Sequence, residues 1–573
     1  MKLKHVGCLL VMVMGWAQLE AEVDPRERTF VAPVRIVWQS SEPDKRSGVT
    51  GADSLLAAKH GHVPEWSWDQ VADGCALEND GKSSGILLDF GRELHGGVRI
   101  GFGTGTRRNR LRIRFGESVA EAMSEIGEKG ATNDHAVRDD VVEAPVFGSL
   151  EFGQTGFRFV RLDLVTPGRV VLQSVRAVSL MRPMKRIGSF RCSDERLNAI
   201  FETAVRSVHL CCQDRLWDGI KRDRLVWMGD THPETMTVLS VFGAASVLPE
   251  TLDYARDTTP VGTWMNRMPT YTLWWIRNVA EWYRFTGDRS FLGRHADYLE
   301  QTFDFVLTAF DEECRWTKDA FLDWPTRHNK EAEAAGVQAL ALIAAREAGF
   351  LAEALGRTEF ARKARTLVER LGTAKPDPAG EKSAAALLAL SGLRDPGEMF
   401  REVLGKRGCA GVSTFYGYYM LEAMSAANEH RHALDTVREY WGAMLDVGAT
   451  SFWEDFNLAW TNNCFRIDEL PVAGKNDIHG DFGEFCYKGV RHSLCHGWSS
   501  GPAAWCIRNI LGIRPIEVGC KAVVVRPNLC DLDWAEGALA LPDGSSVRVK
   551  VVRNDKGNAD VHIDAPEWVR VTR

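Results

Sequence analysis

A long helical middle restricts the fold of this 573-residue chain more than any other feature. About 320 residues, from 193 to 513, read as helices separated by short breaks. The stretch 332–355 is rich in Ala, Glu and Leu, and Gly356 interrupts it. Thr358 can then cap a second helix over 359–371. Short turns between helices predict antiparallel pairs, so we expect about twelve helices whose hairpins close into an (α/α)6 toroid.

A long bundle or a solenoid would use the same helices. A solenoid shows a repeat of fixed period, and none is present here, so the toroid is favoured. Ser193 is a candidate N-cap where the strand pattern changes to a helical one.

The region before the helices alternates between apolar and polar residues. Residues 110–115 (RLRIRF) and most of 157–164 follow a period of two, which is typical of half-buried strands. Turn-rich segments separate them, so we predict an N-terminal β-sandwich over 22–185. No clustered acid, base or metal set stands out there, and we interpret His95 and Glu117 as structural residues.

The region after the helices returns to strands. Residues 522–527 and 545–552 are β-like, and 541–545 (LPDGS) supplies a hairpin turn between strands. We therefore expect a catalytic or binding toroid over 190–512 and a small C-terminal β-domain over 513–573.

The first 21 residues have the layout of a signal peptide. Lys2 and Lys4 precede an apolar run over 6–16, and small residues lead to a cleavage site after Ala21. The run is too short to span a bilayer, and no other stretch qualifies by inspection. We expect an exported mature protein, secreted or periplasmic, without a membrane span. A signal anchor is the alternative.

Charge and cysteine content exclude some partners. The formal net charge of −7 supplies no basic field for phosphates, so we expect no nucleic-acid partner. The 13 cysteines are irregularly spaced, without a CxxC or zinc-site pattern. We expect buried free thiols for most of them, some pairing being possible in an oxidising compartment, and no metal or cofactor.

The stretch 217–234 (WDGIKRDRLVWMGDTHPE) concentrates charge beside aromatic rings. Asp218, Asp223 and Asp230 stand there with three basic residues and two tryptophans. Such charges are costly to bury unless they are paired, and a purely solvated face seldom carries tryptophan and methionine in its middle. We interpret the stretch as a ring-lined polar pocket that holds a sugar. The alternative is a surface helix in which Asp218 pairs with Arg222 at i, i+4 spacing.

Aromatic and acidic residues recur together in other breaks of the helical region. Their recurrence on one scaffold favours a pocket at the mouth of the toroid over separate core positions. The segments are Trp264, Trp274 and Trp275, then 321–327 (FLDWPTR), 448–455 (GATSFWED) and 492–498 (HSLCHGW).

These motifs resemble those of the bacterial α-L-rhamnosidases, which are inverting glycoside hydrolases with a six-hairpin (α/α)6 barrel flanked by β-domains. The family's Asp, Arg-acid, Trp and Gly-Asp spacing is kept in DGIKRDRLVWMGD at 218–230. Its Gly-Ala-Thr-x-x-Trp-Glu motif appears at 448–454, and its Ser/Asn-x-x-His motif at 493–496. The segment 511–515 resembles the family's run into its C-terminal β-domain.

The resemblance implies roles for particular residues. Asp223 would be the general acid and Glu454 the general base, since an inverting enzyme needs two carboxyl groups roughly 6.5–9.5 Å apart with a water between. A carbohydrate, most simply a rhamnose-containing glycan or glycoside, would be the substrate. The sugar-binding residues carried over, with rings that could stack on the sugar, are Asp218, Arg222, Trp227, Asp230, Trp274, Asp323, Trp324, Trp453 and His496.

This sequence departs from the family at three points. The family usually has Glu where this chain has Asp223, and Pro-Gln where it has Ile220 and Lys221. Aspartate places its carboxyl about 1.3–1.5 Å further back on a fixed backbone, which matters for proton transfer. An insertion around 462–489 separates the second and third motifs and could reshape the pocket rim. Some family members bind calcium, but this chain has no EF-hand-like loop.

Two other functions stay open on the sequence alone. An α/α-toroid enzyme acting on another sugar, as a hydrolase or a polysaccharide lyase, would use the same scaffold. A non-catalytic glycan-binding protein would bind sugar without turnover, with Asp223 as a decayed acid.

Overall fold

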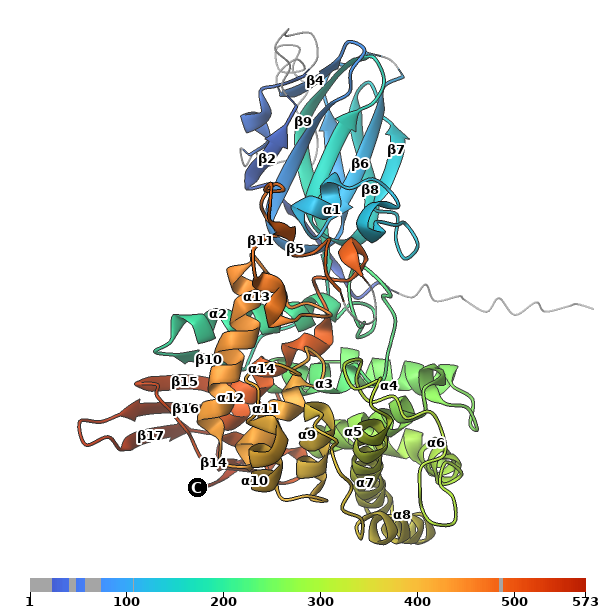
Figure 1. The fold of residues 1–573 in the computed structure, drawn as a ribbon, viewed down its shortest axis with the longest axis vertical. Coiled ribbons are helices and arrows are strands. Elements are labelled where there is room, and N and C mark those ends of the chain that lie inside the picture. The colour runs from blue at the N-terminus through green and yellow to red at the C-terminus, as the bar shows by residue number, and fades with distance from the viewer. Residues whose placement is uncertain (1–22, 41–47, 57–73, 107, 484–487) are drawn as a thin grey trace, which may run out of the picture.

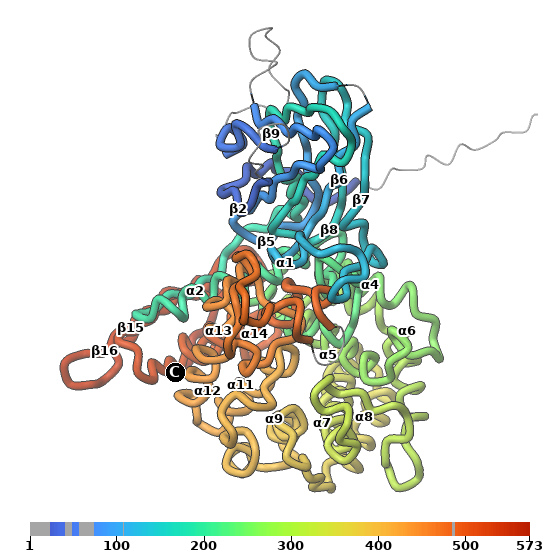
Figure 2. The backbone as a smooth tube through the Cα atoms, turned by 45° about the horizontal axis from the view of Figure 1, so that its top comes forward, coloured from blue at the N-terminus to red at the C-terminus, as the bar shows by residue number. Residues whose placement is uncertain are grey.

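The computed structural model describes residues 23–40, 48–56, 74–106, 108–483 and 488–573. The predicted signal peptide lies outside these residues. A β region is followed by a long helical region and then by short sheets, as the sequence predicted (Figure 1). The β region stands at one end of the helical region in both views (Figures 1 and 2).

The N-terminal β region is one hydrogen-bonded network of strands. The central strand β5 pairs with β2 over its first half and with β9 over its second half, with register shifts between them. Because β5 changes its neighbouring strand halfway along its length, the network bends into the predicted sandwich. The described strands are β1 (Glu27–Val31), β2 (Arg35–Gln39), β3 (Gly48–Thr50), β4 (Cys75–Asn79), β5 (Ser84–Phe102), β6 (Arg110–Gly116), β7 (Asp139–Glu143), β8 (Gly148–Leu164) and β9 (Gly168–Met181).

The two alternating segments of the sequence are β6 and β8, and they pair antiparallel with Leu111 opposite Leu164. Leu111, Ile113 and Phe115 are buried, so the apolar face of β6 points into the sandwich core. The short helix α1 (Val119–Met123) follows β6 and faces the helical region.

The helical region alternates between helices with buried faces all round and helices with one exposed face. Each pair is consecutive in the chain, which is the hairpin arrangement expected from the short turns. The helices are α2 (Glu195–Cys211), α3 (Thr231–Phe242), α4 (Val247–Thr258), α5 (Pro269–Thr286), α6 (Arg289–Leu307), α7 (Lys330–Ala354), α8 (Thr358–Leu371), α9 (Lys382–Ser391), α10 (Pro396–Met399), α11 (Gly417–Ala426), α12 (His430–Thr436), α13 (Gly442–Asp446) and α14 (Gly501–Trp505).

An inner ring is closed by contacts between successive inner helices. In the part of the chain that the structure describes, α3 packs on α5, α5 on α7, α7 on α9, α9 on α11 and α11 on α14, and α14 returns to α3. Every residue of α3 is buried, whereas the outer helix α8 has a strongly one-sided apolar face. A helix buried on all sides belongs to the centre of a large assembly, so the contacts confirm the predicted toroid.

Inner helix α7 is long and apolar. Among the described helices it alone reaches the length and mean hydropathy (1.3) of a membrane span, which the sequence inspection overlooked. It packs between α5, α8 and α9, and this place in the ring explains its apolar character.

Two predicted helix caps are wrong by one residue. Asp194 caps α2, because its side chain accepts hydrogen bonds from two backbone N–H groups, while Ser193 Oγ instead accepts from the backbone N–H of Asp533. Thr358 is the first residue of α8 rather than its cap. The turn before it passes through Gly356 in the left-handed region, with φ of 70°.

The C-terminal strands form two sheets, and one of them includes a strand from before the helices. Strand β10 (Ser189–Cys192) pairs antiparallel with β15. The prediction that residues 513–573 alone build this part is therefore wrong, whereas the predicted turn at 541–545 joins β15 to β16. The strands are β13 (Ile513–Pro515), β14 (Ala522–Val525), β15 (Trp534–Ala540), β16 (Ser546–Arg553), β17 (Ala559–Asp564) and β18 (Arg570–Thr572).

Candidate active site

The predicted site residues gather at the N-terminal ends of the inner helices. The stretch 217–230 is an irregular loop that leads into α3, so the alternative of a surface helix is wrong. Asp218 closes this loop on itself: its N–H donates to the carbonyl of Leu225 (3.0 Å), and its Oδ1 accepts from the N–H of Leu225 (2.9 Å). Because the inner helices follow each other in a ring, the loops before them share one mouth.

Backbone hydrogen bonds join three motif loops at this mouth. The N–H of Gly497 donates to the carbonyl of Asp218 (2.8 Å), which links the first and third motifs. The N–H of Glu454 donates to the carbonyl of Ser493 (3.0 Å), which links the second and third. The first motif lies more than 200 residues before the other two in sequence, yet all three form one backbone cluster.

Arg222 connects the two predicted catalytic carboxylates. Its Nη2 pairs with Oε2 of Glu454, and its Nη1 lies 3.8 Å from Oδ1 of Asp223. Both carboxylates therefore contact the same guanidinium group, which holds them in one cluster. The Glu454 side chain is 3% exposed and that of Asp223 is 19% exposed, so Asp223 is the more open of the two.

Glu454 is held in its ionised form. Burial alone would raise its pKa, but the charge of Arg222 outweighs burial, and His496 and the backbone N–H of Ser493 (3.0 Å) act in the same direction. Together they lower the pKa of Glu454 to about 2. A carboxylate that stays ionised at neutral pH fits the position of a general base.

Asp230 and His496 form a second polar pair. His496 Nε2 lies 3.2 Å from Oδ2 of Asp230, and the Tyr271 hydroxyl donates to Oδ1 (3.0 Å). Burial raises the pKa of Asp230, and burial with the nearby charges of Asp230 and Asp223 raises the pKa of Asp218 well above its ordinary value. Burial opposes the charged form of His496, but the bond to Asp230 and nearby carboxylates raise its pKa. These groups can donate to or accept from sugar hydroxyls.

Asp323 reaches the same cluster through the loop before α11. Its Oδ2 accepts from Ser413 Oγ (2.7 Å), and the neighbouring Thr414 hydroxyl donates to the carbonyl of Glu454 (2.5 Å). Burial raises the pKa of Asp323 to about 7. Sequence reasoning did not single out Tyr271, Ser413 or Thr414, because no motif marks them.

The four predicted tryptophans divide into two groups. Trp227 and Trp324 are half-buried, and a line of edge-to-face rings through Tyr271 and Phe321 connects them. Such partly open rings can stack on a sugar.

Trp274 and Trp453 are fully buried. The Trp274 ring stacks on Tyr419 at 5.0 Å, and Trp453 packs edge-on against Phe456. These contacts favour core packing, and a sugar contact for these two rings stays a prediction.

A buried ion network joins the first motif to the β region. Lys221 Nζ lies 2.9 Å from Glu117 and 3.3 Å from Glu121, and it donates to the carbonyls of Val490 and His492 (2.8 and 2.7 Å). Burial raises the pKa of Glu117 to about 7, although the charge of Lys221 opposes this rise.

The same carboxylate also holds the third motif. Glu117 accepts from the hydroxyl of Ser493 (3.1 Å) and from the N–H of Leu494 (2.6 Å). The interpretation of Glu117 as a structural residue is consistent with these contacts. Glu117 holds a loop of the candidate active site in place.

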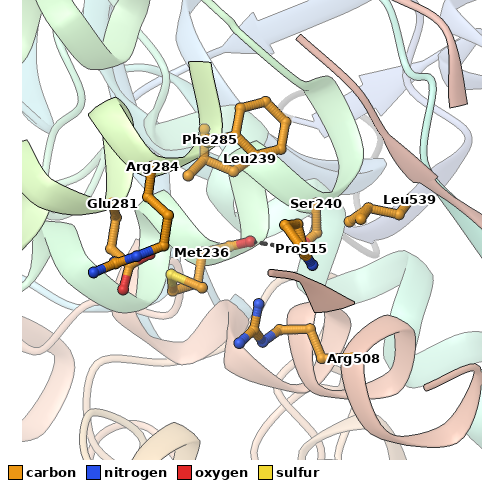
Figure 3. A pocket seen from close by; sticks show the side chains of 9 residues that line it. All are labelled: Met236, Leu239, Ser240, Glu281, Arg284, Phe285, Arg508, Pro515 and Leu539. Atoms are coloured by element: carbon orange, nitrogen blue, oxygen red, sulfur yellow. Dashed lines mark hydrogen bonds and ion pairs between the residues drawn. The ribbon is translucent and has the colours of Figure 1, made fainter. Parts of the chain in front are cut away.

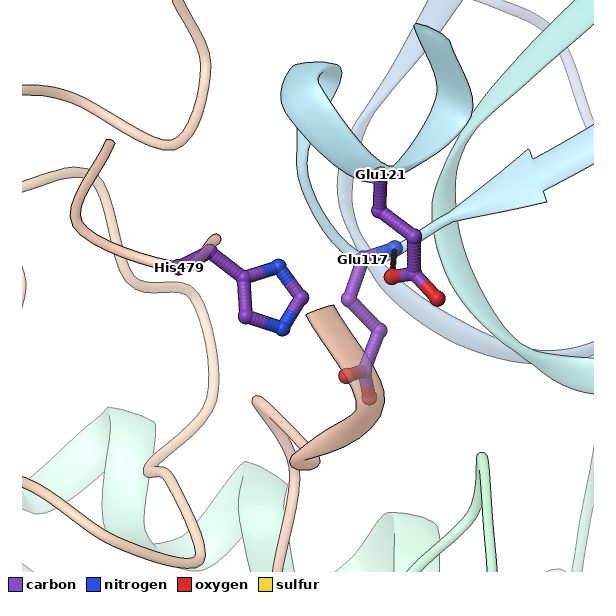
Figure 4. A group of neighbouring side chains, drawn as sticks. All are labelled: Glu117, Glu121 and His479. Atoms are coloured by element: carbon purple, nitrogen blue, oxygen red, sulfur yellow. Dashed lines mark hydrogen bonds between the residues drawn. The ribbon is translucent and has the colours of Figure 1, made fainter. Parts of the chain in front are cut away.

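Glu117, Glu121 and His479 together have the composition of a metal site (Figure 4). The ammonium group of Lys221 contacts both carboxylates and therefore takes the position a cation would need. His479 Nδ1 instead bonds the hydroxyl of Ser118 (2.7 Å), which ties the described part of the inserted segment around 462–489 to the N-cap of α1.

A separate cavity lies towards the other ends of the inner helices (Figure 3). Its walls come from the later turns of α3 and α5 and from the C-terminal sheets, and it includes the Glu281–Arg284 pair (3.3 Å). Its charged groups are paired within the protein, and it does not include the motif residues.

Comparison with known proteins identifies the helical domain. Residues 185–375 match the sequence model of the bacterial alpha-L-rhamnosidase six-hairpin glycosidase domain, and this match contains the first acidic motif and Asp323. A comparison with curated protein sequences gives no match.

Several solved structures similar to this chain are rhamnosidases. The GH78 family rhamnosidase of Bacillus sp. GL1 superposes with a TM-score of 0.72 at 22% identity, covering 87% of this chain and 54% of that one. The rhamnosidase from Klebsiella oxytoca with rhamnose bound gives 0.65 at 19% identity, covering 84% and 96%. The Streptomyces avermitilis alpha-L-rhamnosidase complexed with L-rhamnose gives 0.65 at 18%, covering 87% and 50%.

This chain thus spans about half the length of the Bacillus and Streptomyces proteins and nearly all of the Klebsiella protein. At these identities the likeness concerns the fold. Together with the sequence match it confirms the resemblance that the motifs indicated: residues 185–375 match the six-hairpin glycosidase domain of the bacterial alpha-L-rhamnosidases, and the fold is similar to that of solved rhamnosidases.

Proposed function

We propose that this protein is an exported inverting glycoside hydrolase that removes terminal rhamnose, or a related deoxysugar, from glycans or glycosides. Asp223 is the general acid and Glu454 the general base. The observation that carries the proposal is the shared contact of both carboxylates with Arg222 at the mouth of the barrel.

The reaction follows from the difference between the two carboxyl groups. Asp223 gives its proton to the glycosidic oxygen, which leaves with the electron pair of the broken C–O bond. Glu454, kept ionised by Arg222, takes a proton from a water that attacks the anomeric carbon from the opposite face. One displacement inverts the anomeric configuration.

Polar groups around this pair supply the sugar subsite. Asp218, Asp230, Asp323 and His496 offer acceptors and donors for hydroxyl groups, while Trp227 offers an apolar face for a deoxysugar methyl group. Two solved structures with a similar fold contain bound rhamnose, and this supports rhamnose as the sugar that the site binds.

The charge of the site disfavours a polysaccharide lyase. A lyase neutralises a uronate with cations, but the guanidinium of Arg222 is paired with Glu454 here, and His496 is paired with Asp230. A hydrolase of another neutral sugar is the second candidate, and the two differ only in the glycoside cleaved.

The predicted leader over residues 1–21 is the support for export. Cell fractionation of a full-length, C-terminally tagged protein tests it. The proposal expects the tag in the periplasm or medium and a mature N-terminus at Glu22.

The activity test is hydrolysis of 4-nitrophenyl α-L-rhamnoside beside a panel of other neutral aryl glycosides. Asp223→Asn and Glu454→Gln keep the size of each side chain and remove the ionisable group. Asp555→Asn, on the exposed turn between β16 and β17, is the matched control. NMR of the first product identifies its anomer.

We expect rhamnoside cleavage with β-L-rhamnose formed first. Glu454→Gln should lose roughly 10²- to 10⁴-fold in kcat, and the control should be unchanged. Cleavage of a different glycoside with the same mutant pattern would keep the mechanism and replace the sugar. Glycan binding without any turnover would establish the non-catalytic alternative.

A further inference from the structure

A histidine of the N-terminal β region reaches the proposed general acid. His135 lies between α1 and β7, about 90 residues before Asp223, and its Nδ1 is 3.3 Å from Asp223 Oδ1. The two side chains are 24% and 19% exposed, so the contact sits at the rim of the site and not in the core. No sequence motif marks His135.

The backbone on both sides of this contact is anchored. Arg224, next to Asp223, donates to the backbone carbonyls of His135 and of Gln154 in β8. Arg224 has φ of 58°, an uncommon conformation that such anchoring sustains. On the other side, Arg491 pairs with Asp134, which precedes His135.

Two donors converge on the same oxygen of the acid. His135 Nδ1 lies 3.3 Å and Arg222 Nη1 3.8 Å from Oδ1 of Asp223. In a protonated carboxyl group one oxygen carries the proton and the other is a carbonyl-type acceptor. Donors at Oδ1 therefore favour the form in which Oδ2 carries the proton.

We propose that His135 is a positioning residue for Asp223. In its Nδ1–H tautomer it donates to Oδ1, orients the short aspartate side chain, and leaves the transferable proton on Oδ2. This inference rests on the proposed function and deepens it: the β region supplies a contact that offsets the missing methylene of the family's glutamate. The proton passes from Oδ2 to the glycosidic oxygen, the resulting carboxylate keeps the His135 bond, and solvent water returns a proton after release.

The first test separates proton donation from general damage. His135→Ala removes the donor, whereas His135→Asn places an amide N–H near the position of Nδ1. His562→Ala, on the exposed face of β17, is the matched control. Each variant is assayed on the 4-nitrophenyl and methyl glycosides of the sugar that the wild-type enzyme cleaves. The methyl leaving group needs protonation, whereas 4-nitrophenolate leaves readily without it.

We expect His135→Ala to lose about 10- to 100-fold in kcat on the methyl glycoside and less than about threefold on the nitrophenyl glycoside. KM should change little, and His135→Asn should restore most of the rate. Equal losses on both substrates, or no rescue by asparagine, would overturn the positioning role.

The second test does not depend on turnover. ¹⁵N NMR of the imidazole in wild type should show Nδ1 as the protonated nitrogen of the neutral ring. At one fixed pH, Asp223→Asn should change the ¹⁵N resonance of His135 Nδ1, because the carboxyl oxygen that accepts from it is replaced; Asp134, Arg224 and Arg491, which also face His135, are unchanged in this comparison. Identical imidazole resonances in both proteins would refute the pairing even if the chain cleaved nothing, whereas a changed resonance without turnover would refute the hydrolase alone.

Discussion

Replacing Lys221 by methionine should destabilise the protein strongly although it leaves all the carboxylates of the site in place. The Lys221 side chain is 9% exposed, and its ammonium group contacts Glu117, Glu121 and two backbone carbonyls. Methionine has a similar length and no charge. The variant therefore leaves two buried carboxylates and two carbonyl groups without their donor.

Breaking a buried ion pair by removing one partner costs about 3–5 kcal/mol of unfolding free energy at neutral pH. The deficit should depend on pH. The pKa of Glu117 is raised to about 7, above its ordinary value, so this carboxyl favours folding in its protonated form. Acidification from about pH 8 to pH 5 should therefore shrink the deficit of Lys221→Met.

Urea unfolding followed by tryptophan fluorescence measures these free energies, with Lys556→Met on the exposed β16–β17 turn as the control. Glu117→Gln and the double variant complete a cycle, in which we expect a coupling of at least about 1 kcal/mol. A deficit below about 1 kcal/mol, or one that grows on acidification, would refute the account of Lys221 as the cation of this network.

Two further predictions concern stability and substrate affinity. The pKa of Glu454 is lowered to about 2, below its ordinary value, so its ionised form stabilises the fold above about pH 4.5. This contribution is lost as the pH falls towards 2, so the difference in unfolding free energy between wild type and Glu454→Gln should narrow over that window. A difference that stays constant with pH would contradict the prediction. Trp274→Ala should cost roughly 3–5 kcal/mol of unfolding free energy because the ring is fully buried. Trp227→Ala should cost under about 1 kcal/mol and raise KM for the glycoside. The reverse pattern in urea unfolding and kinetics would make Trp274 the sugar-binding ring and Trp227 the core residue.

Local patterns in the sequence predicted the architecture because they act over short distances. Alternation identified β6 and β8, and the run of short-turned helices predicted the closed ring. The helix caps were predicted wrongly because neighbouring residues compete for the same cap position. Asp194 takes the cap that Ser193 could have made, since its carboxylate satisfies two N–H groups at once.

Contacts between distant segments were less accessible to sequence reasoning. Pairing of β10 with β15 joins residues more than 300 positions apart, and no alternation pattern encodes a partner. The same holds for His135 and Glu117, which lie in a region without a motif and act on loops of the barrel. The acidic motifs were found because their residue types, crowded in one stretch, are costly unless they serve a site.

Two positions at which this sequence departs from the rhamnosidase motifs lie on the face that meets the β region. Lys221, in place of the usual glutamine, binds the carboxylates at the start of α1, and Asp223, in place of glutamate, contacts His135. Arg222 between them points the other way, to Glu454. Lys221 and Asp223 thus contact the sandwich, whereas Arg222 between them contacts the barrel. A change on either of these two surfaces would move Asp223 relative to Glu454. We infer that the sandwich and the loop must vary together, and that this β region is a working part of the site and not a separate binding module.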